Sequence, residues 1–159
     1  RITAGGLILI LLTVLLRTDD YLGPGMHVVE EALHGNAVPF AFLLKILFTA
    51  ITIGAGYKGG EIVPSFFVGA TFGCVLAPLI GADASLCAAI GMTSVFCGVT
   101  NCPVTALLIS FELFGFDHAY YFLPAIAISY MLSGYYSLYH SQTIVYSKYE
   151  NRYVNKKAE

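Results

Sequence analysis

Long apolar stretches, separated by short breaks of glycine, proline and charged residues, make up most of the 159-residue chain. The stretches are of helical length, and the breaks hold the residue types that end and begin helices. The pattern predicts an amphipathic helix at residues 26–33 and apolar helices at residues 2–16, 38–53, 62–80, 86–99, 104–114 and 119–138. A further apolar segment begins at 141–149, and 151–159 is polar.

Several of these segments are shorter than the roughly 20 residues that a straight helix needs to cross a bilayer. Short, interrupted helices are typical of transporters, whose substrate site lies where helix ends meet inside the membrane. Composition agrees, because 57% of the residues are hydrophobic and 11% are charged. Mean hydropathy is +0.75, whereas about a quarter of the residues of an average soluble domain are charged. We therefore expect an all-α integral membrane protein in a lipid bilayer.

Charge and chemistry exclude several other classes. The net charge of −2 offers no basic surface for nucleic acid. The cysteines lie in apolar runs, form no CxxC pair and have no histidine at ligand spacing, so buried free thiols are predicted; they are Cys74, Cys87, Cys97 and Cys102. No nucleophile–base pair stands out. We expect no metal, no cofactor and no enzymatic activity.

Charged residues outside the loops are few. Lys45 is the only charge in the segment 38–53, and such a lysine more often reaches the interface or lines a protein interior than takes part in chemistry.

The basic residues after Tyr146 place the C-terminus on the cytoplasmic side by the positive-inside rule; they are Lys148, Arg152, Lys156 and Lys157. We therefore divide the chain into a transmembrane helical part, 1–147, and a cytoplasmic tail, 148–159. The start at Arg1, without Met, suggests a piece of a longer protein.

The glycine-rich stretch 54–64, with sequence GAGYKGGEIVP, carries the clearest candidate site. Pro64 suits the first turn of a helix, where its missing N–H needs no partner. The glycines before it allow a tight turn and leave backbone amides uncovered. A bare helix N-terminus of this kind attracts anions. The alternative is a tight turn between helices that binds nothing.

Four motifs, in order, resemble the CLC family of chloride channels and anion/proton antiporters. They are GGEIVPS at 59–65, in the place of the family's GxFxP motif, FVGATFG at 67–73, NCPVT at 101–105 with Phe111-Glu112 after it, and IVYS at 144–147. The resemblance covers essentially the whole chain and matches the C-terminal, inverted-repeat half of the CLC membrane domain. It implies a helical bundle of short, broken and tilted helices.

The resemblance also implies roles for individual residues. The anion-binding positions would be Gly60, Glu61, Ile62, Val63 and Tyr146. The amides of Glu61 and Ile62 would face the central anion, and the hydroxyl of Tyr146 would reach it from a separate helix start. Gly59 and Pro64 would shape the loop. For Glu112 we expect a structural role, as a buried carboxylate whose hydrogen bonds hold helices in place.

The resemblance implies partners as well. They are a small inorganic anion, protons, the N-terminal half of the same protein and a second copy in a homodimer. That other half would carry the gating glutamate, so channel and antiporter remain open alternatives here. A bacterial plasma membrane is the expected location.

Glu61 stands where chloride-type members of the family have an apolar residue. A carboxylate beside a halide site is costly unless it is protonated, turned away or used to move protons. The stretch GGEIVP is similar to the GExxP form of the fluoride-selective bacterial branch. This favours fluoride/proton antiport, with proton coupling at Glu61. The alternatives are a Glu61 that only stabilises the helix dipole, a chloride/proton antiporter, a voltage-gated-type chloride channel and, lower, a membrane scaffold that transports nothing.

Overall fold

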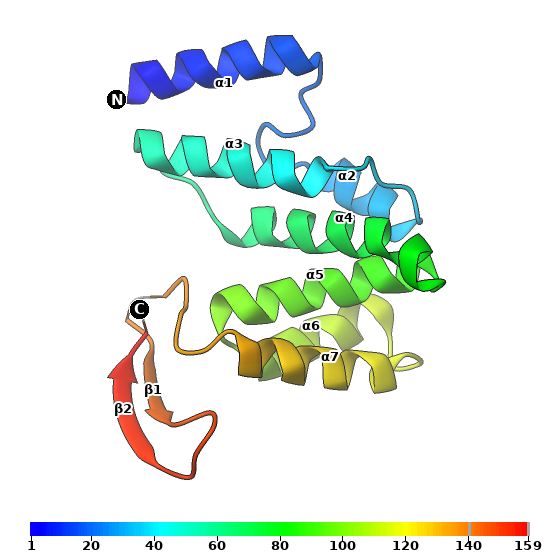
Figure 1. Cartoon of the computed structure of the whole chain (residues 1–159), viewed down its shortest axis with the longest axis vertical. Coiled ribbons are helices and arrows are strands. Elements are labelled where there is room, and N and C mark those ends of the chain that lie inside the picture. The colour runs from blue at the N-terminus through cyan, green and yellow to red at the C-terminus, as the bar shows by residue number, and fades with distance from the viewer. Residues whose placement is uncertain (140, 159) are drawn as a thin grey trace.

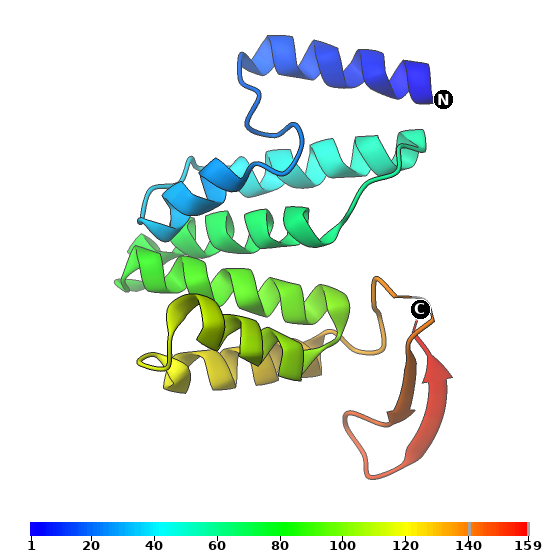
Figure 2. The ribbon, with the colours of Figure 1, turned by 180° about the vertical axis from the view of Figure 1, so that it is seen from behind.

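The computed structural model describes residues 1–139 and 141–158. Helices lie side by side as a stack that runs from α1 to α7, with a β-hairpin at one end (Figures 1 and 2). The elements are α1 (Ile2–Leu16), α2 (Met26–Leu33), α3 (Ala41–Ala55), α4 (Ile62–Ile80), α5 (Ala84–Thr100), α6 (Pro103–Phe114), α7 (Ala119–Leu132), β1 (Thr143–Tyr146) and β2 (Tyr153–Lys157). The predicted α-helical fold is confirmed, with the hairpin as an addition.

Helix boundaries follow the local signals in the sequence. The predicted bounds of α1, α2 and α4 are those observed, and α3, α5 and α6 start within three residues of the prediction. The last helix is shorter than predicted, because α7 ends at Leu132 rather than at residue 138. Gly134, two residues beyond that end, has a φ of 59°. This left-handed conformation favours glycine and does not continue a helix.

Helices α4 and α5 form the closest pair in the stack. Gly69 and Gly73 on α4 lie against the backbone of α5 at Gly91 and Cys87, so that a Cβ at either glycine would collide with main-chain atoms. Small residues spaced in this way allow helix backbones to approach within a membrane. The close approach of the two backbones therefore depends on these glycines.

Much apolar surface is exposed on the outside of the stack. On α1 the exposed side chains include Leu7, Leu11, Val14 and Leu15, and Leu79 of α4 is 81% exposed. Exposed apolar side chains in this number suit lipid or another part of a membrane protein rather than water. Within the described residues, only α4 is both long and apolar enough to span a bilayer alone, with 19 residues and a mean hydropathy of 1.9. The prediction of short helices thus holds for the other elements.

The C-terminal segment differs from the prediction. Tyr146 was expected at a helix start, but it ends strand β1, which pairs antiparallel with β2 and places Tyr146 opposite Tyr153. The expected boundary between residues 147 and 148 falls in the turn of this hairpin. Lys148 fastens the turn to the end of α7, since its Nζ donates to the carbonyl oxygen of Tyr130 at 2.6 Å and to Oγ of Ser133 at 2.9 Å. Alternating side chains and β-branched residues favour a strand here.

Candidate functional site

The start of α4 is an open helix N-terminus. Glu61 precedes the helix with φ −94° and its side chain makes no capping hydrogen bond. The amides of Ile62 and Val63 belong to the first turn, where no intrahelical acceptor exists, and neither has a hydrogen-bond partner among the described residues. Pro64 has no N–H, so the first amide of α4 that is bonded is that of Ser65, to the carbonyl oxygen of Glu61 at 3.2 Å. The predicted bare helix start is present.

The glycines before α4 divide into two kinds. Gly56 ends α3 with a φ of 94°, a conformation that L side chains rarely adopt. The tight turn expected in this stretch is therefore at Gly56. Gly59 and Gly60 are exposed and lack positive φ values, and a Cβ at either would meet nothing within 4 Å. They leave the approach to α4 open without forming the turn.

A cavity of about 310 Å³ lies beside this helix start. One wall is the glycine loop and first turn of α4, with Gly60, Val63 and Pro64. A second wall is α3, and a third is the loop between α1 and α2 at residues 21–24. The uncapped end of α4 thus borders a partly open pocket rather than a flat surface. Such a space suits a small ligand that needs hydrogen-bond donors.

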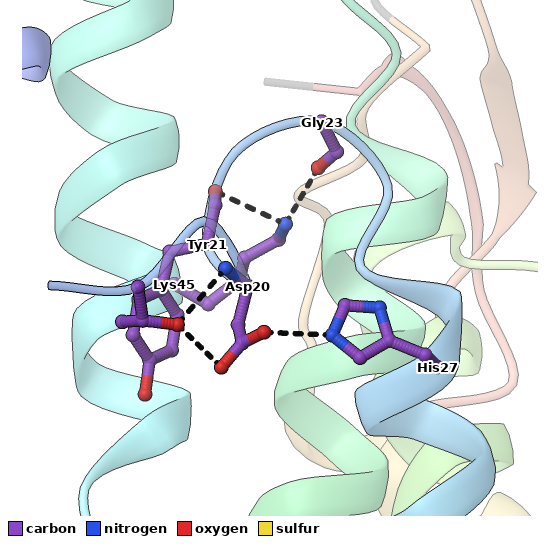
Figure 3. A network of polar contacts seen from close by, with 6 residues as sticks. Asp20, Tyr21, Gly23, His27 and Lys45 are labelled. Atoms are coloured by element: carbon purple, nitrogen blue, oxygen red, sulfur yellow. Dashed lines mark hydrogen bonds and ion pairs between the residues drawn. The ribbon is translucent and has the colours of Figure 1, made fainter. Parts of the chain in front are cut away.

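Lys45 of α3 lines this cavity and is only 1% exposed. Its Nζ donates to the carbonyl oxygen of Gly23 at 2.6 Å and to that of Tyr21 at 3.4 Å (Figure 3). The same nitrogen lies 4.8 Å from the ring centroid of Phe67, on the second turn of α4. Sequence reasoning did not place Lys45 in the site. The sequence signal for Lys45 was that it is the only charged residue of an apolar helix. In the structure it lies in the protein interior and not at the membrane interface.

The loop that covers Lys45 is held by its own polar contacts. Asp20 accepts from Oγ1 of Thr18 at 2.6 Å and lies 2.8 Å from Nε2 of His27 (Figure 3). The hydrogen bond from Thr18, followed by that with His27, holds the pKa of Asp20 below its ordinary value. Tyr21 is buried, with its ring 5.7 Å from that of Phe48. The loop is therefore an ordered wall, and its carbonyl oxygens have fixed positions over α3.

The structure brings together some predicted site residues and not others. Gly59, Gly60, Val63 and Pro64 line the cavity, and Glu61 and Ile62, both partly buried, lie between them in sequence. Tyr146 does not join this group. It is 67% exposed, its ring packs on Tyr153 at 6.0 Å between centroids, and the two strands contact only each other among the described elements.

The expectation for Glu112 is wrong. Its side chain is exposed, and it makes no hydrogen bond with any described residue. The cause is the helical period, since Ala106 and Ser110 are the buried residues of α6. Glu112 is two residues beyond Ser110, which turns it about 200° around the helix axis. It faces away from the helices that α6 packs on and holds none of them in place.

These features are those of a helical membrane protein with an uncapped helix start, and comparison with known proteins gives the family. The chain belongs to the voltage gated chloride channel family, because the sequence profile of that family matches residues 1–134. This match ends before the segment that contains Tyr146. It includes the glycine loop and all seven helices of the described chain.

Two similar proteins agree with membership in this family. A chloride/fluoride channel protein of Pseudomonas syringae pv. tomato is 37% identical over 131 residues, which are 82% of this chain and 29% of that protein. An H(+)/Cl(-) exchange transporter of Vibrio vulnificus is 27% identical over 127 residues, 73% of this chain and 27% of that protein. The chain thus spans less than a third of the length of either relative.

A solved structure agrees on the fold. The crystal structure of a CLC-type fluoride/proton antiporter superposes with a TM-score of 0.82 at 37% identity, and the match covers 87% of this chain and 35% of that one. The described residues therefore form part of a CLC-type helical bundle. Anion transport by an integral membrane protein is the activity of this family, and the partial coverage agrees with the predicted half-domain.

Proposed function

We propose that this chain is the C-terminal half of a fluoride/proton antiporter and that the transported anion binds at the first turn of α4. The observation that carries the proposal is the uncapped start of α4 beside a cavity. The amides of Ile62 and Val63 have no other acceptor among the described residues and lie at the positive end of the helix dipole. Neutral donors bind an anion without trapping it, as rapid transport requires. Gly60 contributes an open approach.

Glu61 is the proposed proton-coupling group. It directly precedes α4, where the anion is proposed to bind, is partly buried, and its side chain makes no capping hydrogen bond. A protonated carboxyl donates a strong hydrogen bond, and fluoride is a small anion that accepts such bonds well. The names of the similar proteins, a chloride/fluoride channel protein and a CLC-type fluoride/proton antiporter, support this choice of ion. Tyr146 is not part of the proposed site.

Chloride/proton antiport is the second candidate. It is favoured by the similarity to the H(+)/Cl(-) exchange transporter of Vibrio vulnificus, although that protein is only 27% identical. Under either function we place the protein in a bacterial plasma membrane as a homodimer, together with an N-terminal half. The basic residues of the hairpin, among them Arg152 and Lys157, favour a cytoplasmic C-terminus.

Ion efflux from liposomes tests the proposal. The full-length protein is reconstituted, and fluoride and chloride are followed with ion-selective electrodes while external pH is recorded. We expect fluoride to leave about tenfold or more faster than chloride, with protons moving in the opposite direction. Equal rates would favour the chloride exchanger. No efflux of either anion would contradict transport altogether.

The variant Glu61→Gln tests the residue that distinguishes this site. It keeps the size of the side chain and removes the titratable proton. We expect fluoride efflux to fall by about tenfold or more and proton coupling to be lost. Glu31→Gln is the matched control, because Glu31 is an exposed carboxylate of α2 outside the cavity. If Glu61→Gln matches the unaltered protein in both measurements, Glu61 does not couple protons.

A further inference from the structure

We propose that the C-terminal hairpin, which is β1, β2 and the turn between them, is a docking surface for anionic phospholipid headgroups. The hairpin follows residues 1–134, which match the family profile. The inference therefore concerns a part of the chain that the match to the family does not include. It goes beyond the proposed function and does not depend on which anion is transported.

The first argument is the position of the hairpin beside the apolar surface of α7. This helix exposes apolar side chains as far as its last residue, Leu132, which is 80% exposed. The turn of the hairpin is bonded to the same end of the helix. Lys148 donates to the carbonyl oxygen of Tyr130, and the hydroxyl of Tyr149 donates to a carbonyl oxygen one residue further on. Figures 1 and 2 show the hairpin beside this end of α7. A bilayer whose apolar core covers α7 therefore brings the hairpin to the level of the headgroups.

The second argument is the positive charge of the hairpin. Residues 143–159 hold four of the eight Lys and Arg residues of the chain but only two of its ten Asp and Glu residues. Arg152 and Lys157 are both exposed. The ion pair of Arg152 with Glu150 is 3.9 Å long, and both side chains are more than two-thirds exposed, so the pair contributes little. Both cations are therefore able to meet an anionic surface, and a guanidinium group matches the geometry of a phosphate.

The third argument is a group of exposed tyrosines around these cations. Tyr146 and Tyr153 lie opposite each other in the hairpin, with their rings edge to face at 6.0 Å between centroids. The exposed tyrosines are Tyr136, Tyr139, Tyr146, Tyr149 and Tyr153. A tyrosine has an apolar ring and a polar hydroxyl, which suits the boundary between lipid and water. The cations alone would suit any anion. Exposed rings beside the apolar end of α7 favour the surface of a bilayer.

Lipid binding by the full-length protein in detergent tests the inference. Phosphatidylglycerol and phosphatidylcholine are titrated separately, and native mass spectrometry gives the dissociation constant of each lipid. We expect phosphatidylglycerol to bind about tenfold or more tightly than phosphatidylcholine, and less tightly as salt is raised. Arg152→Gln and Lys157→Gln should each weaken phosphatidylglycerol binding about fivefold, because each removes one basic residue from an anionic surface. Binding of phosphatidylcholine should not change.

Arg17→Gln is the matched control. Arg17 is exposed at the end of α1, which lies on the side of the stack away from the hairpin (Figure 1). Its loss should leave both dissociation constants within about twofold of those of the unaltered protein. If Arg17→Gln weakens phosphatidylglycerol binding as much as Arg152→Gln does, the lipid responds to net charge and not to the hairpin. That result would overturn the inference, as would unchanged binding in the two hairpin variants.

Two further measurements separate other occupants of this surface. Glycerol 3-phosphate carries a phosphate without acyl chains, and we expect it not to displace phosphatidylglycerol at equal concentration. Displacement would show a site for free phosphate and overturn the assignment to lipid. Tyr153→Ser removes an exposed ring, and we expect about threefold weaker phosphatidylglycerol binding and unchanged elution in size-exclusion chromatography. Altered elution would assign the surface to a second copy of the chain. Efflux by the unaltered protein decides the proposed function separately, because it measures transport and not lipid binding.

Discussion

Helices α4 and α5 pack against each other, yet their N-termini are built in opposite ways. At the start of α5, the side chain of Asp83 accepts a hydrogen bond from the amide of Leu86 at 2.8 Å. At the start of α4, Glu61 occupies the same position and caps nothing. The two starts lie at opposite ends of the pair (Figure 1). A cavity borders each of them, and the one at the start of α4 is lined by the buried Lys45. The proposed anion site is thus at the helix start whose donors are left free.

The residue types at the two helix starts explain why one is capped and the other is not. Aspartate is among the best N-cap residues, because its short side chain reaches the amides of the first turn. Glutamate is longer and is not among the preferred caps. In addition, Pro64 as the third residue of α4 removes one of the amides that a cap would bind. The start of α5 is closed by its own side chain, whereas the start of α4 remains available to a ligand.

The largest expected effect comes from separating the two helices. Gly73→Val places a side chain against the backbone of Cys87 on α5, which has no room to move aside. We expect a loss of about 3 kcal/mol and little folded protein after size-exclusion chromatography. Gly54→Ala is the control, since its Cβ meets nothing within 4 Å and its position near the end of α3 favours alanine. Equal yields of the two variants would contradict the close packing of α4 on α5.

The next effect comes from making the start of α4 resemble that of α5. Glu61→Asp keeps the carboxylate but brings it within reach of the amide of Val63. We expect the helix to gain about 1 kcal/mol and anion efflux to slow about tenfold, because the new cap competes with the anion. Melting temperature and efflux from liposomes measure the two effects. If the variant melts higher and transports normally, the first-turn amides do not bind the anion.

The smallest effect comes from opening the start of α5. Asp83→Ala removes the cap, and we expect a loss of about 1 kcal/mol in the free energy of unfolding with unchanged efflux per folded molecule. Thermal unfolding in detergent measures the first quantity. Ser85→Ala, an exposed neighbour that makes no capping bond, is the control. A large loss of transport in Asp83→Ala would show that the two helix starts do not have separate roles.

The sequence by itself determined the elements whose signals are local. The bounds of α1, α2 and α4 follow from apolar runs and the breaks between them, and the cap at Asp83 follows from its residue type. The uncapped start of α4 was predictable for the same reason, since glycine and proline act on their own stretch of backbone. The family was also readable, because its motifs are short and keep their order.

Tertiary structure decided what depends on partners distant in the chain. Lys45 donates to carbonyl oxygens more than 20 residues earlier in the chain, and nothing in its own helix reveals that contact. Glu112 faces outward because α6 packs through Ala106 and Ser110. Tyr146 lies in a strand because residues 153–157 pair with it. A short apolar segment suits a helix or a strand equally well, and a lone charge suits an interface or an interior. In each case the choice depends on which neighbour satisfies the backbone or the charge.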